Sequence, residues 1–207
     1  MIDIHITGGL DDMKMDGLRE MGSIGAAHAS SALSTLVGKD ILVEVSECFM
    51  CKAQDLPSAF GDAQEIVVAV LLEAYGTGKG EIMLILDQHM ATELADMVLG
   101  REHQESRALD DMDRDAICEI GNICASAYLS AVAKFLGTTL LPSPPGVAVD
   151  MLRAILQYPA ALAEAESDCS VVIKTRFVYG HESCLGFMLY MPDRGSQAAL
   201  MEKFRVM

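Results

Sequence analysis

The chain has 207 residues, of which 51% are hydrophobic, and its 15 basic and 30 acidic side chains give a formal net charge of −15. This length allows one domain or two small ones, and the hydrophobic fraction is that of a packed globular protein rather than a disordered chain. The acidic charge would repel nucleic acid and anionic membranes, which leaves solubility, a saline cytoplasm or a basic protein partner as its explanation.

The first residues carry no recognisable targeting signal. They are mixed and acidic, without a basic region followed by a long apolar stretch, and we expect residues 1–11 to be an extra tail. The most apolar run, IVVAVLLEAY, is shorter than a membrane helix and contains Glu73. We therefore expect a cytoplasmic protein that does not enter a membrane, with its six cysteines free in a reducing compartment.

Two of these cysteines, Cys48 and Cys51, form a C-x-x-C pair. A structural zinc site needs four ligands, and no second C-x-x-C or paired histidine follows at zinc-finger spacing. Metal binding or redox chemistry is therefore the less favoured interpretation of the pair, and its role stays open.

The predicted elements occur in the same order twice along the chain. The order is a helix, a strand, a short Pro-containing helix, a β-hairpin and a further helix, and a polar segment at 101–113 separates the two copies. The first copy is predicted at 16–38, 40–50, 53–63, 65–86 and 87–100, and the second at 115–137, 146–152, 154–168, 169–191 and 192–204. The glycine-rich stretch at 76–80 lacks the spacing of a phosphate-binding loop and is predicted to be a hairpin turn.

Identical residues support an internal duplication, and each repeated helix ends at a glycine suited to a C-cap. Two halves, at about 12–100 and 110–207, would share one core through a pseudo-two-fold axis. Because hairpins dominate each half, the expected fold is one α+β domain, spanning residues 1–207, with a mostly antiparallel sheet of about six strands. The matched pairs are Asp16/Asp115, Glu20/Glu119, Gly22/Gly121, Ile24/Ile123, Ala26/Ala125, Ser31/Ser130, Ala32/Ala131 and Gly38/Gly137.

The second repeated helix presents a polar stripe. Asp115, Glu119 and Asn122 stand at i, i+4 and i+7, within roughly 60° of one another around a helix. A merely solvated face would give the same pattern, yet an asparagine inside a helix is unfavourable by a few tenths of a kcal/mol relative to alanine. A carboxylate can pair with a lysine, and an amide can hold a water for attack on a phosphoryl group.

These residues resemble the motif of the CheC/CheX/FliY family of chemotaxis phosphatases, and of CheC most closely. The family motif is Asp or Ser, three residues, Glu, two residues, Asn, twenty-two residues and Pro. Asp115, Glu119, Asn122 and Pro145 meet all four positions. The resemblance covers nearly the whole chain and implies a pseudo-symmetric fold of α-helices and β-strands.

The resemblance also implies an activity, which is hydrolysis of the aspartyl phosphate on a CheY-type response regulator. Asn122 would orient the attacking water, Glu119 would pair with a lysine of the regulator, and Asp115 and Pro145 would support the helix. Any Mg²⁺ would belong to the regulator, so no cofactor or metal of the chain's own is expected. A further implied partner is the receptor deamidase CheD, and relatives of this kind tend to be monomers.

The first repeated helix departs from the motif. Asp16 and Glu20 are kept, but Ser23 stands in place of the asparagine and Ser46 in place of the proline. We therefore expect one working helix at 115–137 and a degenerate one at 16–38, which could still bind a regulator through Glu20. The alternatives are an adaptor without catalysis, which binds the regulator or CheD or belongs to a motor switch, and, less favoured, a generic acidic scaffold.

Overall fold

The computed structural model describes residues 12–52, 55–60, 64–102, 107–163 and 169–206. The predicted tail at 1–11 lies outside these residues, as do parts of the segments at 53–63, 101–113 and 154–168. The chain order is α1 (Asp12–Val37), β1 (Ile41–Lys52), α2 (Leu56–Ala59), β2 (Ile66–Gly76), β3 (Gly80–Asp87), α3 (Gln88–Leu99), α4 (Asp111–Leu136), β4 (Leu140–Pro142), β5 (Gly146–Met151), α5 (Leu152–Ala163), β6 (Cys169–Tyr179), β7 (Glu182–Pro192) and α6 (Arg194–Val206).

The strands form one sheet in which each described pair is antiparallel. Its order is β1-β6-β7-β3-β2-β4, and β5 also pairs with β2. The prediction of an α+β fold with a mostly antiparallel sheet is confirmed. The three-residue β4 was not predicted, because two prolines separate it from β5 in the sequence. Proline has no backbone amide to donate to a strand ladder, so pairing with β2 stops after β4 and resumes at β5.

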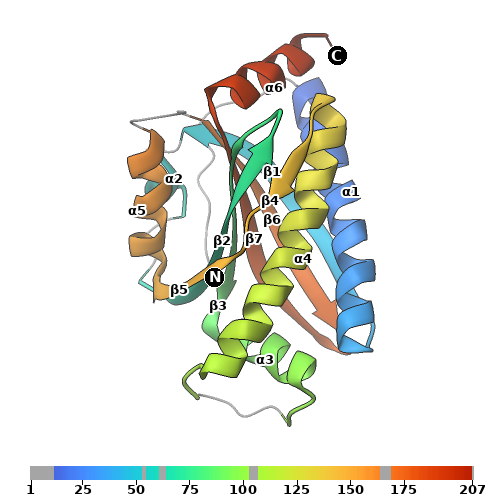
Figure 1. Cartoon of the computed structure of the whole chain (residues 1–207), viewed down its shortest axis with the longest axis vertical. Helices are drawn as coiled ribbons and strands as arrows, with labels where there is room; N and C mark the ends of the chain where they lie inside the picture. Colours follow the sequence, from blue (N-terminus) through green and yellow to red (C-terminus); the bar gives the residue numbers. More distant parts are fainter. Residues whose placement is uncertain (1–11, 53–54, 61–63, 103–106, 164–168, 207) are drawn as a thin grey trace.

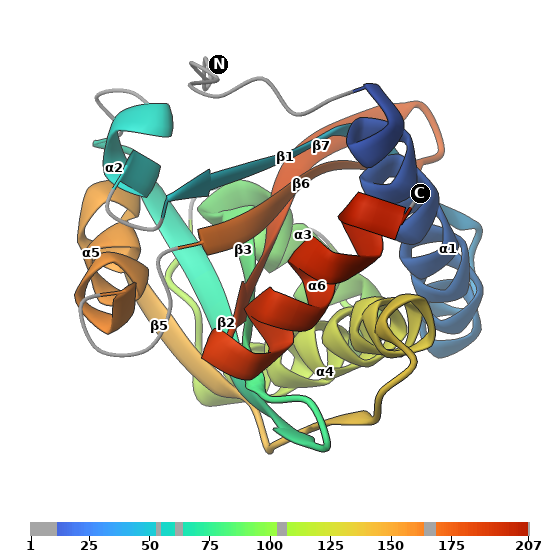
Figure 2. The ribbon, with the colours of Figure 1, turned by 90° about the horizontal axis from the view of Figure 1, so that it is seen from above.

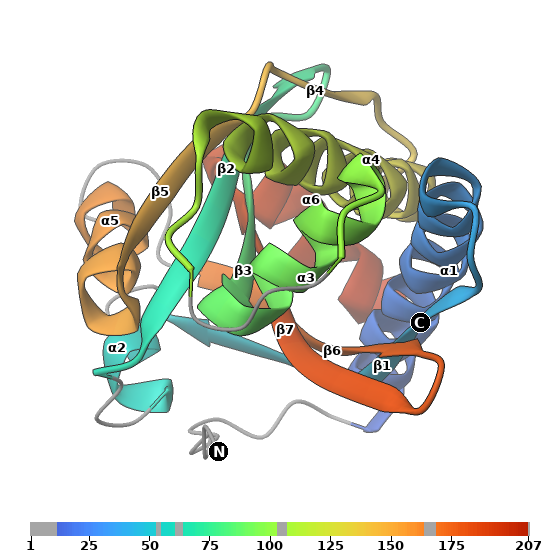
Figure 3. The same cartoon turned by 90° about the horizontal axis from the view of Figure 1, so that it is seen from below.

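Helices cover both faces of the sheet. The long helices α1 and α4 lie side by side on one face and run in opposite directions, whereas α2 and α5 lie on the other face (Figures 1 and 2). The helices α3 and α6 close opposite ends of the layer that contains α1 and α4, as the view from below shows for α3 (Figure 3).

Two hydrophobic cores follow from this layering. The larger core fills the space between the sheet and α1 and α4, and the smaller one lies between the sheet and α2 and α5. Strand alternation divides the residues between them: Cys48 and Met50 face the larger core, and Phe49 between them faces the smaller one. In the smaller core the rings of Phe60 and Phe187 meet edge to face, with centroids 4.8 Å apart.

Close backbone approach depends on a few glycines. A Cβ at Gly121 would lie 2.4 Å from Val70, so this glycine lets α4 rest directly on β2. At the β2–β3 hairpin, Gly76 and Gly80 have φ of 143° and 153°, which confirms the predicted turn. A Cβ at Gly76 would lie 2.4 Å from the Thr139 carbonyl oxygen, so no larger residue fits there.

The sheet order also bears on the predicted duplication. Starting from the central pair β3 and β7, the sheet continues outward through β2 to β5 on one side and through β6 to β1 on the other. Two halves related by a two-fold axis would give this order. The duplication itself and the division into halves at 12–100 and 110–207 stay predictions from the sequence.

Candidate functional site on the helix α4

The helix α4 begins four residues earlier than predicted, at Asp111. Asp110 is its N-cap and accepts a hydrogen bond from the Asp113 amide at 2.8 Å, while the Asp113 side chain accepts one from the Asp110 amide at 2.8 Å. This reciprocal pair is a capping box built with aspartate at its third position. The helix ends where predicted, at Gly137, which adopts the left-handed conformation.

An ion-pair cluster fixes this end of α4 to α3. The Arg107 guanidinium, just before α4, donates to Asp113 on α4 and to Asp96 on α3. Arg101 donates to Asp113 at 3.1 Å and to Asp110 at 3.2 Å. The hydrogen bond from Arg107, with that from the Asp110 amide, lowers the pKa of Asp113 to about 2, against the opposing effect of burial.

The predicted polar stripe is present on α4 and points away from the sheet. Asp115 and Glu119 are exposed and Asn122 is half-buried, whereas Ile117 and Ile120 on the opposite side are buried in the larger core. Among the residues that the structure describes, no hydrogen bond or ion pair engages the Glu119 or Asn122 side chains. A carboxylate and an amide one turn apart are thus open to a partner.

Pro145 lies in the link between β4 and β5, half-buried. The link is held at its start by Ser143, whose amide donates to the Glu73 carbonyl at 2.8 Å and whose hydroxyl accepts from the Glu73 amide at 2.9 Å. Thr77 ties the end of α4 to the β2–β3 turn, since its hydroxyl accepts from the Thr139 amide at 2.9 Å. The segment that follows α4 is therefore anchored to β2.

The corresponding stripe on α1 is more exposed. Asp16, Glu20 and Ser23 are all exposed, and Asp16 makes a 3.8 Å surface ion pair with Arg19. Ser46, at the position of the motif proline, lies exposed on β1. Because α1 and α4 are neighbours on the same face of the sheet, both stripes belong to one helical surface, but the asparagine of the motif is present on α4 alone.

The structure separates the two cysteines of the C-x-x-C pair. Cys48 lies in the larger core under α1, and Cys51 packs against the smaller core on the other face of the sheet. Burial raises the pKa of each thiol to about 12, so neither is a ready thiolate. Within the described part of the chain, no group of three or more histidine, cysteine, aspartate or glutamate side chains is placed to hold a metal ion.

Among the described helices, α4 is long and apolar enough to cross a membrane by length and composition alone. It has 26 residues and a mean hydropathy of 1.4 over an 18-residue window, 56% of which is buried within the molecule. The sequence argument did not single out α4, because it relied on the longest unbroken apolar run and not on the average across a helix that alternates small and polar residues. Core helices of water-soluble proteins meet the same criterion, so the finding is weak evidence for a membrane.

Comparison with known proteins shows the family of the chain. Residues 112–149, which contain the stripe on α4 and Pro145, match the model of the CheC-like family. The CheY-P phosphatase CheC of Bacillus subtilis is 30% identical over 197 residues, which cover 93% of this chain and 94% of that protein. The chain therefore belongs to the CheC family, within the wider group of CheC, CheX and FliY proteins.

Solved structures share the fold. FliY of Thermotoga maritima superposes with a TM-score of 0.76 at 21% identity, covering 96% of this chain and 98% of that one. A chain of the FliG–FliM complex from H. pylori superposes with a TM-score of 0.69 at 11% identity, covering 93% of this chain and 100% of that one. At these identities the likeness concerns the fold alone.

Proposed function

We propose that this protein hydrolyses the aspartyl phosphate of a CheY-type response regulator in the cytoplasm, through Glu119 and Asn122 on α4. The observation that carries the proposal is the exposed carboxylate and the accessible amide one helical turn apart, in the segment that matches the family model. The name of the Bacillus subtilis relative, a CheY-P phosphatase that aligns along nearly the whole chain, supports the same substrate.

Asn122 is proposed to position the attacking water. Its amide can accept a hydrogen bond from the water and donate one, which holds the water oxygen in line with the P–O bond to be broken. The water oxygen then bonds to phosphorus, the aspartate of the regulator leaves as a carboxylate, and the product is inorganic phosphate. The regulator would supply the Mg²⁺ that neutralises the phosphoryl oxygens, so the phosphatase itself needs to add little beyond orientation.

Glu119 is proposed to dock the regulator by pairing with a lysine beside its phosphoryl group. The side chain is exposed and free of partners among the described residues, so pairing would break no existing contact. Asp115 lies one turn earlier on the same face and would add to the negative potential there. A rim charge of this kind mainly affects the rate of association and makes it sensitive to salt.

The α1 stripe is proposed to bind a regulator without hydrolysing its phosphate. Glu20 is exposed as Glu119 is, but the Ser23 hydroxyl stands one carbon from the backbone and reaches less far than an amide. This observation also favours the second candidate function, an adaptor that binds the regulator without catalysis, for this half of the surface. Binding to CheD is a further proposal that rests on the family resemblance.

The test is the loss of phosphate from a phosphorylated CheY-type regulator of the same cell, followed with Asn122→Ala, Glu119→Gln and the wild type. We expect Asn122→Ala to lower the turnover rate about 100-fold at saturating regulator and Glu119→Gln mainly to weaken binding. Ser126→Ala, one turn beyond Asn122 on the same face, is the matched control and should change neither. Binding by the wild type without faster loss of phosphate would refute the phosphatase and leave the adaptor.

A further inference from the structure

The two edges of the sheet differ in whether their outward backbone groups are hydrogen-bonded. At the β1 edge, the outward amide of Ile41 donates to the Ser34 hydroxyl of α1 at 2.9 Å, and that of Val43 donates to the Ser30 hydroxyl at 2.8 Å. Ser34 in turn donates to the Ile41 carbonyl at 3.1 Å. Two serines one helical turn apart thus satisfy the start of an edge that could otherwise pair with another chain.

At the β5 edge, none of the described residues covers the central backbone groups in this way. The amide of Leu152 donates to the Glu65 carbonyl at 2.9 Å, so the backbone groups of Leu152 are directed toward β2. In an antiparallel ladder the backbone groups of every second residue are directed toward the same neighbouring strand. Residues 146, 148 and 150 therefore bond to β2, and Val147 and Val149 direct their amides and carbonyls outward. Within the described residues nothing pairs with these groups, although the next outward amide, that of Met151, is taken by the Asp150 carboxylate at 2.7 Å.

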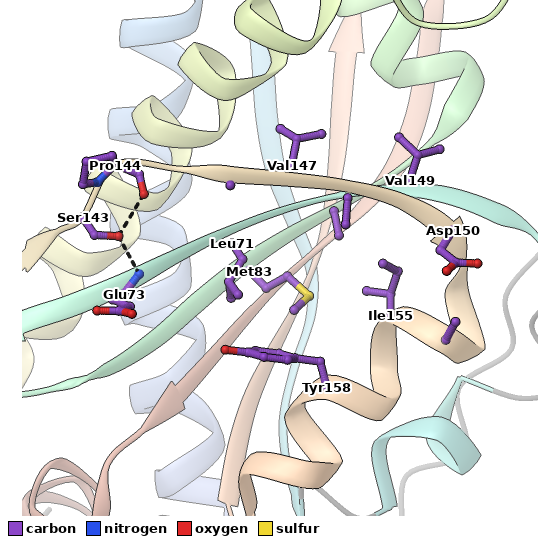
Figure 4. Close-up of a pocket in the computed structure, with 14 residues that line it drawn as sticks. Leu71, Glu73, Met83, Ser143, Pro144, Val147, Val149, Asp150, Ile155 and Tyr158 are labelled. Atoms are coloured by element: carbon purple, nitrogen blue, oxygen red, sulfur yellow. Dashed lines mark hydrogen bonds between the residues drawn. The ribbon is translucent and has the colours of Figure 1, made fainter.

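A pocket of about 490 Å³ runs beside this open edge, on the face of the sheet that carries α5. Figure 4 shows Leu71 and Met83 on the sheet beneath it and Ile155 and Tyr158 of α5 at its side. Val147 and Val149 point away from it (Figure 4). Tyr158 is 41% exposed, and its hydroxyl donates to Glu81 at 3.1 Å, which holds the ring in place.

The acidic charge of the pocket favours a basic partner segment. Among its described lining residues the two charged ones, Glu73 and Asp150, are both acidic and exposed, and they stand at opposite ends of the pocket in Figure 4. A second copy of this chain, with its net charge of −15, would bring like charges together there. Glu73, Asp150 and the apolar lining lie on the same face of the sheet, and only alternate residues of an added strand face that side. A segment whose residues on this face are apolar in the middle and basic at both ends would fill the pocket and pair with both carboxylates.

We propose that the β5 edge and its pocket bind an extended segment of a partner protein whose alternate residues, those on the pocket face, are apolar in the middle and lysine or arginine at both ends. The segment adds an antiparallel or parallel strand to the sheet through the outward backbone groups of Val147 and Val149. On the face that carries the pocket, its central apolar side chains enter over Leu71 and Met83, and its terminal basic side chains reach Glu73 and Asp150. Main-chain bonds supply affinity in this mode of binding, and the pocket supplies specificity.

The test uses a synthetic probe, the acetylated and amidated heptapeptide Lys-Thr-Val-Thr-Leu-Thr-Lys, with the full-length protein; its residues 1, 3, 5 and 7 lie on one face and match the spacing between Glu73 and Asp150, whose strand partner Val67 stands six residues before Glu73. We expect saturable binding in isothermal titration and slower amide exchange at Val147 and Val149. Val149→Pro removes one outward amide and should weaken binding at least tenfold, whereas Val149→Thr keeps the amide and the shape and should bind as the wild type does. Glu73→Gln with Asp150→Asn should weaken binding most strongly at low salt.

Three results would overturn the proposal. The first is equal binding of a probe whose alternate amides are N-methylated, because that would leave only charge attraction. The second is unchanged affinity in Val149→Pro when its thermal unfolding matches that of Val149→Thr. The third is no binding of the probe by a protein that sediments as a dimer and that Val149→Pro converts to a monomer, which would assign the edge to a second copy. None of these readouts depends on phosphatase activity.

Discussion

Gly25 on α1 faces the ring of Tyr128 on α4, and a Cβ at Gly25 would lie 2.6 Å from Cδ1 of that ring. Tyr128 is 2% exposed and belongs to the larger core, so its ring has no room to move aside. This contact sets how closely the two motif-bearing helices approach each other. The distance between the two polar stripes therefore depends on a glycine that carries no chemistry.

Gly25→Ala should destabilise the protein. Alanine is more favourable than glycine inside a helix by about 1 kcal/mol. Overpacking a buried contact costs about 1–3 kcal/mol, and a 2.6 Å approach to a buried ring should cost an amount near the upper end of that range. We expect a net loss of about 1–2 kcal/mol in urea unfolding. Gly195→Ala on α6, where the new Cβ would lie 3.7 Å from the Asp193 carboxylate, should be neutral or stabilising. Equal effects at the two glycines would contradict the packing described here.

Tyr128→Phe should leave stability unchanged or raise it by up to about 1 kcal/mol. The hydroxyl is buried and has no hydrogen-bond partner in the described structure, and burial raises its pKa well above the ordinary value. Removing an unsatisfied polar group costs no hydrogen bond and ends a desolvation penalty. The free energy of unfolding in urea is the measurement. A loss above 1 kcal/mol would show that the hydroxyl has a partner, such as a bound water.

Asp113 should make stability depend on pH in the acid range. Its pKa is lowered from 3.8 to about 2 in the folded state, so its contribution is present above about pH 4 and is lost as the pH falls toward 2. A shift of this size corresponds to about 2 kcal/mol. We expect Asp113→Asn to be less stable than the wild type at pH 6, and the difference between the two to shrink toward pH 2. A difference that does not vary with pH would contradict the ion-pair account.

Ser34→Ala should destabilise the protein by about 1–2 kcal/mol, because the Ile41 amide would lose its partner in a half-buried place. Ser31→Ala, three residues earlier, is the control: Ser31 is exposed and donates only to the carbonyl of Ala27 in its own helix, at 3.2 Å. It should change stability by less than about 0.5 kcal/mol. If both variants unfolded alike, the serines would not be covering the β1 edge.

Much of the fold could be predicted because short stretches of the sequence carry the patterns of their own secondary structure. Strand alternation around residues 40–50 and the glycines at 76–80 define a strand and a hairpin without any knowledge of the partner strands. Gly137 marks the end of α4 for the same reason. The i, i+4, i+7 spacing of Asp115, Glu119 and Asn122 is enough to place them on one face, and helix geometry makes that face exposed when the opposite one is apolar.

The remaining features depend on contacts between distant residues. The start of α4 was missed because a capping box with aspartate at both ends lies in a polar segment that looks like a linker. Arg107 gives no sign in the sequence that it joins Asp96 to Asp113. The serines that cover β1 are ordinary helix residues until the strand is placed beside them, and the open edge of β5 appears only once the sheet order is known.

The most direct measurement is the rate of phosphate loss from the phosphorylated regulator with two exchanges compared side by side. Asn122→Ser gives α4 the side chain that α1 has, and Ser23→Asn gives α1 the side chain that α4 has. We expect the first to abolish most of the acceleration, about 100-fold, and the second to leave the wild-type rate in place or increase it. Full acceleration by Asn122→Ser would contradict the assignment of catalysis to α4.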